Sequence, residues 1–350
     1  RRQRQMCIRD RVMPIKVNMF SSASKVKGQG VGSAYEELIR LLKTHFPKEI
    51  DLSINRYTQA DISHYHTIDP QFFVSTFTKK RGVKVGYVHF LPETIEGSLK
   101  IPQPFRWLFY KYIIAFYKRM DQIVVVNPTF IDQLVKYGIK REIITYIPNF
   151  VRKDEFYQYD AEQRRQVREQ LGVQDRFTIL GIGQVQERKG VKDFIKLAQQ
   201  HPEMYFIWAG GFSFGRLTDG YADLKKVVDN PPANLKFTGI VDRNKLVEYY
   251  NAADLFLLPS YNELFPMSVL EAFSCGTPVM LRDLDLYHSI IKGYYIAADN
   301  YAEMDQKLSA LVKNPAQLRG YQQRADQASA EYSEDHLAEI WLNYYSSLLK

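Results

Sequence analysis

The sequence predicts an α/β protein with two domains, each a parallel sheet covered by helices on both faces. Its 350 residues are too many for one average core and enough for two. Short apolar runs alternate with helical patterns along the chain, which is typical of parallel sheets. The alternation starts again after Pro148, so we place the boundary between the domains near residues 147–150.

The N-terminal domain is assigned to residues 13–149. IKVNMF (15–20) is predicted to be a strand, and a helical pattern at 33–46 follows it after a glycine-rich turn. Two further apolar runs, at 83–90 and 122–127, are expected to continue the sheet.

The C-terminal domain is assigned to residues 150–330 by a second series of apolar runs. We expect its strands at 177–185, 204–211, 234–240, 254–260 and 278–283. A last helical pattern at 334–349 places apolar residues three and four positions apart, so one of its faces should be buried. We expect residues 331–350 to pack back on the N-terminal domain.

Residues 1–12 differ from the rest of the chain. Their sequence, RRQRQMCIRDRV, has no hydrophobic period and resembles translated sequencing-adapter sequence, with a genuine basic arm as the alternative. Five arginines and one aspartate in it contribute +4 of the formal net charge of +8. The remaining +4 is too small to indicate nucleic-acid binding, and we expect none.

Cysteine content and hydropathy limit the possible environments. Cys7 lies in the N-terminal segment just described, which leaves Cys275 as a single thiol that cannot form an internal disulfide. A reducing compartment fits this pattern. No apolar run reaches the roughly 18 to 20 residues of a membrane span, and Lys111 interrupts the longest aromatic stretch at 105–117. We expect a chain that can touch a membrane without crossing it.

Two glutamates in the C-terminal half indicate a sugar or ribose site. Glu263 follows a predicted strand that ends at Ser260, and Glu271 lies in a helix predicted to begin near Pro266. Ligands of open α/β sheets bind at the carboxyl ends of strands, and carboxylates accept hydrogen bonds from paired hydroxyls. The alternative is two solvated surface glutamates, but the preceding strand and the Cys-Gly-Thr-Pro turn at 275–278 favour a site.

Residues 251–280, NAADLFLLPSYNELFPMSVLEAFSCGTPVM, resemble the signature of the retaining glycosyltransferases of family 4. The resemblance extends over the chain from Met13. It implies the GT-B fold, in which two Rossmann-like domains face a central cleft. It also implies that Glu263 contacts the donor sugar and that Glu271 binds the ribose of the nucleotide.

The turn after Glu263 departs from this family pattern. The family usually has a glycine-containing turn where this chain has Leu264, Phe265 and Pro266. The resemblance places Leu264 and Phe265 beside the donor, but Pro266 has no N–H to donate. The number of backbone donors to the sugar therefore stays open.

A cationic loop at residues 181–190, GIGQVQERKG, predicts a diphosphate site. Its glycines permit close backbone approach, as at Gly183, and Arg188 and Lys189 place cations near a helix start. The alternative is two solvated cations in a turn. Lys189 matches the lysine of the family loop, whereas Gln184 occupies the family's arginine position. Arg188 either compensates for that arginine, or the arginine is dispensable.

Two further turns resemble donor-binding loops of the same family. Gly210 and Gly211 would let the backbone approach the nucleotide, and Val241 belongs to a turn that resembles the one contacting the base; plain structural turns are the alternative. Asp283 and Asp285 form a D-x-D pattern, which we interpret as a chance match to the metal motif of another fold. The resemblance implies that cations and helix dipoles, with no metal ion or other cofactor, stabilise the leaving diphosphate.

The N-terminal half is expected to hold the acceptor. The glycine-rich turn after the first strand contains Gly30 and Gly32, which the resemblance places beside the donor phosphate; a turn that only permits packing is the alternative. His89 matches the family histidine that approaches the donor sugar. His64 and His66 resemble a strand-end motif with a mainly structural role.

Residues 105–119, FRWLFYKYIIAFYKR, form a predicted helix rich in aromatic and basic side chains. Such a combination suits the headgroup boundary of an anionic membrane, and an ordinary helix with a wide core face is the alternative. The residues expected to face a membrane or acceptor are Trp107, Lys111, Ile114, Lys118 and Arg119.

Several motifs together narrow the resemblance to glycolipid synthases of Gram-positive bacteria, which add a second hexose to monoglucosyl-diacylglycerol. The motifs are KVKGQGVGSAY, DISHYHTIDP, GYVHFLPET, YIPNFV and PSYNELFP. The resemblance implies a cytoplasmic hexosyltransferase, peripheral on the inner face of the cell membrane. It would transfer galactose or glucose from UDP-galactose or UDP-glucose to a membrane glycolipid acceptor, glucosyl-diacylglycerol.

Two other functions stay open. A family 4 transferase acting on a cell-wall polysaccharide or a soluble acceptor would keep the donor site without the membrane helix. A non-catalytic partner that binds sugar nucleotides would be expected to have lost donor residues. The presence of Glu263, Glu271, Lys189 and His89 disfavours that second alternative.

Overall fold

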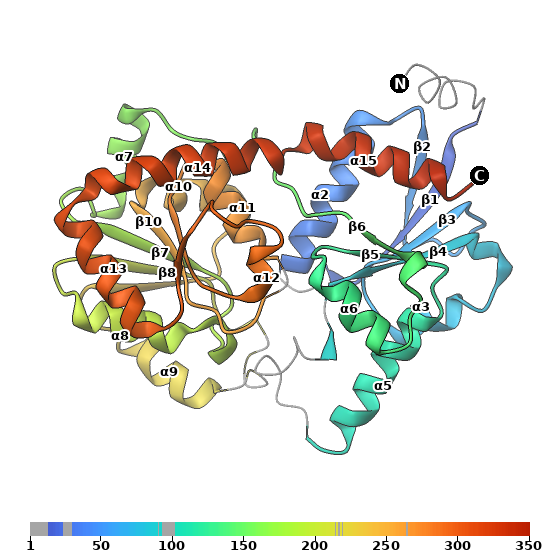
Figure 1. The fold of residues 1–350 in the computed structure, drawn as a ribbon, viewed down its shortest axis with the longest axis horizontal. Coiled ribbons are helices and arrows are strands. Elements are labelled where there is room, and N and C mark those ends of the chain that lie inside the picture. Colours follow the sequence, from blue (N-terminus) through green and yellow to red (C-terminus); the bar gives the residue numbers. More distant parts are fainter. Residues whose placement is uncertain are drawn as a thin grey trace.

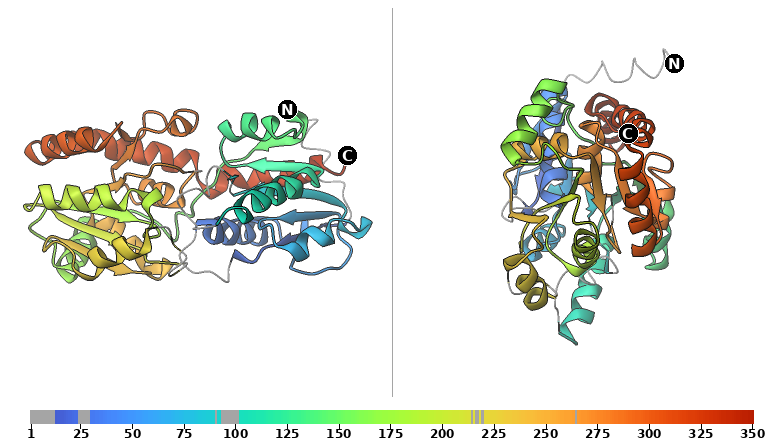
Figure 2. Two further views of the ribbon diagram at one scale, coloured as in Figure 1. Left: turned by 90° about the horizontal axis from the view of Figure 1, so that it is seen from below. Right: turned by 90° about the vertical axis from the view of Figure 1, so that its left-hand side faces the viewer.

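The computed structural model describes residues 13–23, 30–89, 91–92, 102–213, 215, 218, 220–263 and 265–350. Within these ranges the chain forms two sheets of six strands, which lie in two α/β halves of the molecule (Figure 1). Each pairing between neighbouring strands is parallel. Helices cover both faces of each sheet (Figure 2), so the predicted α/β class is confirmed.

The N-terminal sheet has the strand order β2-β1-β3-β4-β5-β6. Its strands are β1 (Ile15–Phe20), β2 (Ile50–Ile54), β3 (Ile62–Tyr65), β4 (Val83–Val88), β5 (Gln122–Val125) and β6 (Ile144–Tyr146). The helices of this half are α2 (Gly30–His45), α3 (Pro70–Ser75), α5 (Phe105–Lys118) and α6 (Thr129–Lys136).

The C-terminal sheet has the strand order β12-β11-β10-β7-β8-β9. Its strands are β7 (Thr178–Ile182), β8 (Tyr205–Ala209), β9 (Leu235–Gly239), β10 (Leu255–Leu258), β11 (Val279–Arg282) and β12 (Ile296–Ala298). The helices of this half are α7 (Ala161–Leu171), α8 (Val191–Gln200), α9 (Tyr221–Asp229), α10 (Arg243–Ala252), α11 (Met267–Ser274), α12 (Asp285–His288), α13 (Tyr301–Lys313) and α14 (Leu318–Glu331), and the last helix of the chain is α15 (Glu334–Ser347).

The apolar runs of the sequence become central strands. Every residue of β7 and of β10 is buried, as expected for strands covered by helices on both faces. A Cβ added to Gly181 in β7 would lie 2.6 Å from the ring of Trp208 in β8. Glycine at this position therefore makes room for a large core side chain.

The first helix begins earlier than the sequence indicated. It starts at Gly30, so Gly30 and Gly32 lie in the first turn of α2 and not in the turn that precedes it. A Cβ on Gly32 would lie 3.4 Å from the carbonyl oxygen of Ala23, in ordinary contact. The expected position of both glycines in a loop was therefore wrong.

The chain passes between the two halves twice, at neighbouring positions. The N–H of Val151 donates to the carbonyl of Tyr332 at 3.2 Å, and Val151 and Ser333 form an isolated parallel bridge. Beyond this point α15 returns to the N-terminal half (Figure 1). There the hydroxyl of Tyr345 lies 2.8 Å from Nδ1 of His64. Trp341, one turn earlier in α15, packs near the same imidazole.

Candidate active site

Glycines bring the ends of three neighbouring strands into contact in the C-terminal half. Gly183 follows β7 and Gly210 follows β8, with φ angles of 154° and 147°. A Cβ on Gly210 would lie 1.9 Å from the carbonyl oxygen of Gly183, so only glycine fits there. The N–H of Gly210 donates to the carbonyl of Gly239 at 2.9 Å, which joins the end of β9 to the same edge.

The remaining loop residues predicted for the donor lie around this edge. The carbonyl of Gly211 accepts a hydrogen bond from the N–H of Val185 at 3.0 Å. The side-chain oxygen of Gln184 accepts one from the amide of Gln186 at 2.6 Å. Val241, which is half-buried, lies two residues beyond the end of β9.

The cationic loop is held against the end of β10. Gly190, with a φ of 70°, lies so close to Pro259 that an added Cβ would be 2.1 Å from the Pro259 carbonyl oxygen. The N–H of Tyr261 also donates to the carbonyl of Arg188 at 2.9 Å. The loops after β7 and β10 are therefore fastened together by their backbones.

Glu263 is paired with both cations of that loop. Its Oε1 lies 2.5 Å from Nζ of Lys189, and its Oε2 lies 3.5 Å from Nη1 of Arg188. Burial alone would raise the pKa of Glu263, but Lys189 and Arg188 outweigh it and lower this pKa below its usual value. Burial lowers the pKa of Lys189, and the neighbouring carboxylate partly offsets that effect. The cluster thus presents one carboxylate and two cations at one strand edge.

A second network of polar contacts holds the segment after β10. Arg282, at the end of β11, lies 2.5 Å from the carboxylate of Asp193 in α8. Arg282 also donates to the carbonyl of Pro259, and the hydroxyl of Tyr261 donates to Asp193 at 2.6 Å. Because Pro259 and Tyr261 lie in the segment that leads from β10 to Glu263, this buried ion pair fixes the path of that segment.

Glu271 lies in α11, and each of its carboxylate oxygens contacts a protein group. Its Oε1 lies 2.5 Å from Nη1 of Arg243, and its Oε2 accepts a hydrogen bond from the hydroxyl of Tyr250 at 2.7 Å. Nη2 of Arg243 lies 2.7 Å from Oε1 of Glu37 in α2 of the other half. No sequence motif indicated Arg243, Tyr250 or Glu37 as part of this site.

The turn after Glu263 contacts the connection between the halves. Leu264 lies outside the described residues. Phe265 is buried against Tyr332, and its carbonyl accepts a hydrogen bond from the side-chain amide of Asn149 at 3.1 Å. These contacts give Phe265 a packing role at the connection between the halves.

His89 belongs to a row of buried histidines in the N-terminal half. Its Nε2 lies 3.3 Å from Nδ1 of His66, and the rings of His66 and His64 are 4.3 Å apart. Burial lowers the pKa of His89 to about 3. His89 is therefore a neutral hydrogen-bonding group at physiological pH.

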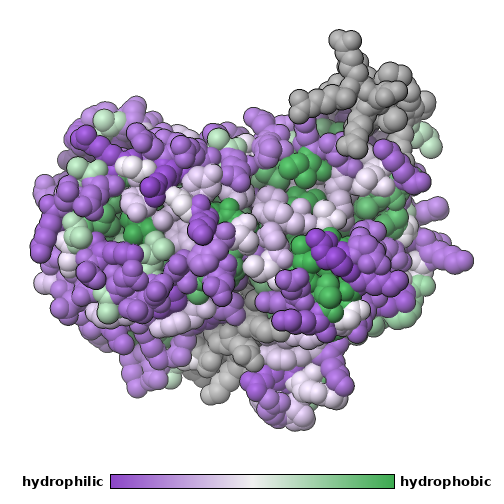
Figure 3. All heavy atoms as spheres, in the orientation of Figure 1, coloured by the Kyte–Doolittle hydropathy of each residue, from purple (hydrophilic) through white to green (hydrophobic). Residues whose placement is uncertain are grey.

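Helix α5 protrudes from the N-terminal half at the lower edge of Figure 1. Trp107 is 57% exposed, and Nζ of Lys111 lies 4.0 Å from the centroid of its ring. Lys118 is also exposed, whereas Ile114 is half-buried and packs on the domain core. Ile114, which was expected to face a membrane or acceptor, therefore lies partly against the domain core. In Figure 3 this lobe shows strongly hydrophilic residues beside residues of intermediate hydropathy.

The end of α5 adjoins two exposed apolar side chains of the α3 region. Arg119 donates to the carbonyl of Thr76 at 3.2 Å, and its guanidinium lies 4.3 Å from the centroid of the Phe77 ring. Phe77 and Val74 are both more than 60% exposed. Among the described residues, no helix is both long and apolar enough to span a bilayer.

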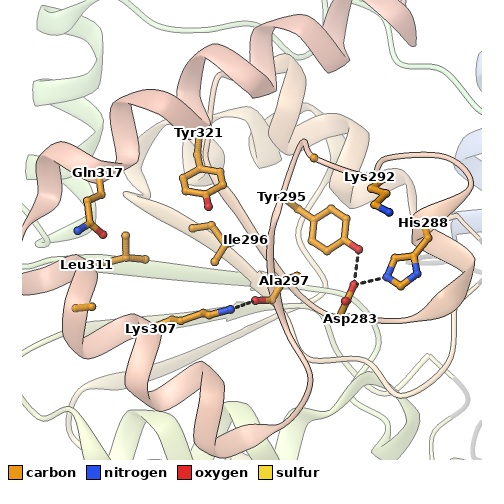
Figure 4. A pocket seen from close by; sticks show the side chains of 12 residues that line it. Asp283, His288, Lys292, Tyr295, Ile296, Ala297, Lys307, Leu311, Gln317 and Tyr321 are labelled. Carbon is orange, nitrogen blue, oxygen red and sulfur yellow. Dashed lines mark hydrogen bonds and ion pairs between the residues drawn. The ribbon is translucent and has the colours of Figure 1, made fainter.

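Asp283 of the D-x-D pattern lies at another hollow, shown in Figure 4. This pocket of about 520 Å³ opens between the end of β11, the edge strand β12 and helices α13 and α14. Oδ1 of Asp283 accepts hydrogen bonds from Tyr295 at 2.6 Å and from His288 at 2.9 Å. Asp283 thus fastens the loop after β11 to β12, away from the cluster of Glu263 and Lys189.

Two parallel-sheet domains, with a carboxylate and two cations at the edge of one sheet, have the architecture of a GT-B glycosyltransferase. A family model of glycosyl transferases group 1 matches residues 163–330, and one of glycosyltransferase family 4 matches residues 30–155. The chain belongs to glycosyltransferase family 4 and is a glycosyltransferase.

Similar proteins of known function or structure agree with this assignment. The chain is 51% identical over 333 residues to the alpha-galactosylglucosyldiacylglycerol synthase of Streptococcus pneumoniae, covering 95% of this chain and 89% of the relative. It is 27% identical to the processive diacylglycerol alpha-glucosyltransferase of Acholeplasma laidlawii, over 78% of this chain and 80% of the relative. The crystal structure of Anabaena HepE in complex with UDP-glucose matches with a TM-score of 0.78 at 15% identity, over 95% and 100% of the two chains, and confirms the GT-B fold.

Proposed function

We propose that this protein transfers galactose or glucose from a UDP-sugar to glucosyl-diacylglycerol, with retention of configuration, and forms a diglycosyl-diacylglycerol. The observation that carries the donor part is the cluster in which Glu263 meets Lys189 and Arg188 at one strand edge. The acceptor is inferred from the 51% identity to the pneumococcal synthase, whose name specifies a diacylglycerol glycolipid.

The cations of the loop after β7 would stabilise the leaving diphosphate. As the bond between the anomeric carbon and the phosphate oxygen breaks, negative charge develops on UDP near Lys189 and Arg188. The acceptor hydroxyl attacks the same face of the sugar, and its proton passes to the departing phosphate. The cations are already in place on the protein, so we expect the reaction to need no metal ion or other cofactor.

Glu263 and His89 would position the transferred sugar. The carboxylate of Glu263 can accept hydrogen bonds from sugar hydroxyls while it stays paired with Lys189, because each carboxylate oxygen has two lone pairs. Neutral His89 can form a hydrogen bond with the sugar, as donor or acceptor, without transferring a proton. Glu271 would bind the ribose hydroxyls.

Helix α5 would dock the enzyme peripherally on the inner face of the membrane. Exposed Trp107 can enter the headgroup boundary, while Lys111 and Lys118 face anionic lipid. Each basic residue near such a surface contributes about 1 kcal/mol, so docking would be weak and reversible.

A donor screen against glucosyl-diacylglycerol in anionic vesicles, read by mass spectrometry, tests this function. We expect one diglycosyl product with UDP-galactose or UDP-glucose, and none with vesicles that lack the acceptor. Transfer to a soluble or polysaccharide acceptor, with no reaction on the glycolipid, would contradict the proposed acceptor. Failure to bind any UDP-hexose would contradict the proposed donor.

A further inference from the structure

Arg243 contacts three carboxylates through three different nitrogens. It is the first residue of α10, and its Nη1 and Nη2 lie 2.5 Å from Glu271 and 2.7 Å from Glu37, respectively. Its Nε lies 3.5 Å from Glu155, and the guanidinium carbon lies 4.8 Å from the centroid of the Phe156 ring. The three carboxylates come from α11, from α2 in the other half and from the segment that connects the halves.

The network around Arg243 is buried and not a surface ion pair. The side chains of Glu37 and Glu271 are 2% and 3% exposed, and that of Arg243 is 22% exposed. Carboxylates removed from water are costly unless a cation and hydrogen bonds compensate them. Arg243 supplies both kinds of compensation to Glu37 and Glu271 at once.

The contacts of Glu271 fix its orientation without using all its hydrogen-bonding capacity. Arg243 donates a hydrogen bond to Oε1, and the hydroxyl of Tyr250 donates one to Oε2. Each carboxylate oxygen can accept a second hydrogen bond, so two vicinal hydroxyls of a ribose can still be bound. A carboxylate held in this way does not have to be ordered when the nucleotide arrives.

We propose that Arg243 is a positioning residue that holds Glu271 for the ribose of the donor and, through Glu37, couples nucleotide binding to the N-terminal domain. The proposal rests on the donor site of the proposed function and goes further by assigning a link from that site to the acceptor half. Glu37 lies in α2 of the N-terminal half and Arg243 in α10 of the C-terminal half, so their contact depends on how the two halves are arranged. Nucleotide affinity and that arrangement must therefore influence each other to the same degree.

The geometry requires arginine at this position. A guanidinium presents fixed donors in several directions, whereas a lysine ammonium is a compact charge on a flexible stem. A lysine side chain here could remain close to Glu271 but could not span the carboxylates of both halves with the same fixed geometry. Arg243→Lys therefore keeps the charge and removes the link.

A protonation step of Glu37 gives a second signature of the link. Burial raises the pKa of Glu37 to about 7; the charge of Arg243 opposes this rise, and Glu155 adds to it. The charged groups around Glu37 and its partners are Arg243, Glu155, Glu271, Arg152 and Arg40. Protonation of Glu37 weakens its attraction for Arg243, so we expect UDP affinity to fall as pH drops below about 7.

UDP titration by calorimetry on the full chain tests the inference without an acceptor. We expect Glu37→Gln and Arg243→Lys to weaken UDP binding about fivefold or more at pH 8, with the melting temperature measured for each variant. Between pH 8 and 6.5 the wild type should lose affinity more steeply than Glu37→Gln, which already lacks the charge. The titration of UDP itself affects both proteins equally.

Glu334→Gln is the matched control. Glu334 lies 3.3 Å from His45 of α2 and 3.5 Å from Arg152 of the connection, so it joins the same regions without touching Glu271. We expect this variant to bind UDP like the wild type. Wild-type affinity and pH dependence in folded Glu37→Gln and Arg243→Lys would overturn the coupling, whereas a wild type that does not bind UDP would overturn the proposed donor and the inference together.

Discussion

Nζ of Lys189 lies 2.5 Å from Oε1 of Glu263, although the two residues follow different strands of the sheet. The short distance results from Gly190, which allows the cationic loop to lie against the carbonyl of Pro259. Each charge compensates the burial of the other. Removing one partner therefore leaves the other charge buried without compensation, which lowers the stability of the fold. Substitutions that test this site should therefore preserve shape and hydrogen bonding.

Glu263→Gln should abolish most transfer while leaving the fold and UDP binding nearly intact. The amide cannot balance Lys189 and Arg188 or hold the sugar as the carboxylate does. We expect kcat to fall on the order of 100- to 1,000-fold in the vesicle assay. Glu187→Gln, in the same loop but paired with Lys192, is the control and should keep its activity. Near-normal turnover of Glu263→Gln would remove Glu263 from the site.

His89→Asn should lower kcat without changing the shape of the pH profile between pH 6 and 8. Burial holds the pKa of His89 near 3, so the histidine does not titrate in this range. The loss of one neutral hydrogen bond would cost about 0.5–1.5 kcal/mol, or roughly 2- to 10-fold in rate. If kcat of the wild type changed with pH near 6.5 and this change were absent in the variant, His89 would instead be shown to carry a proton.

Charge reversal on α5 should weaken attachment to anionic vesicles. Replacing both Lys111 and Lys118 by Glu removes at least ~2 kcal/mol of attraction, which corresponds to about 30-fold in partitioning. Vesicle sedimentation measures the effect. The same reversals at exposed Lys43 and Lys48, at the end of α2 and beyond it, are the control. Equal sedimentation of all three proteins would contradict docking through α5.

Arg282→Met should destabilise the protein by about 3–5 kcal/mol, since it leaves the carboxylate of Asp193 buried without its cation. The double variant Asp193→Asn, Arg282→Met should recover part of this loss, because it removes the uncompensated charge. Urea denaturation of the three proteins measures the differences. A single variant as stable as the wild type would show that the pair does not hold the loops.

The stability of Glu37→Gln relative to the wild type should increase as pH rises. The pKa of Glu37 is raised to about 7 in the folded protein and is near 4.5 in the unfolded chain. Its contribution to stability is therefore fully present below about pH 4.5 and is lost as pH rises through 7. The melting temperature of the variant, relative to that of the wild type, should thus increase between pH 5 and 8. A difference independent of pH would contradict the raised pKa.

The residues of the proposed donor site could be predicted from sequence because they lie in short runs. Glu263 and Glu271 follow one strand, and Arg188 and Lys189 follow the neighbouring strand, so all four lie beyond the carboxyl ends of adjacent strands. Arg243 could not be found in this way. Its partner Glu37 is 206 residues away in the chain, and only the arrangement of the two halves brings them together.

Local patterns also failed where packing decided the outcome. The edge strands β6 and β12 have three residues each, too few for an apolar period, and were not predicted. Ile114 shares a helical spacing with exposed lysines, but neighbouring core residues cover it. The helix α2 begins at Gly30, although glycine has a low helix propensity, so its start was expected later in the sequence.

The two chain segments that connect the halves lie side by side at Val151 and Tyr332. Torsion changes in a few residues there can turn one half against the other while each sheet stays intact, and the largest displacement then falls on parts farthest from that pivot. Because α15 belongs in space to the opposite half from α14, an exchange of donor halves between related enzymes must place its second junction between Glu331 and Glu334. A chimera joined at the first crossing alone would place α15 of one enzyme on the N-terminal core of the other, so the contact between Tyr345 and His64 would have to form between residues of two different enzymes.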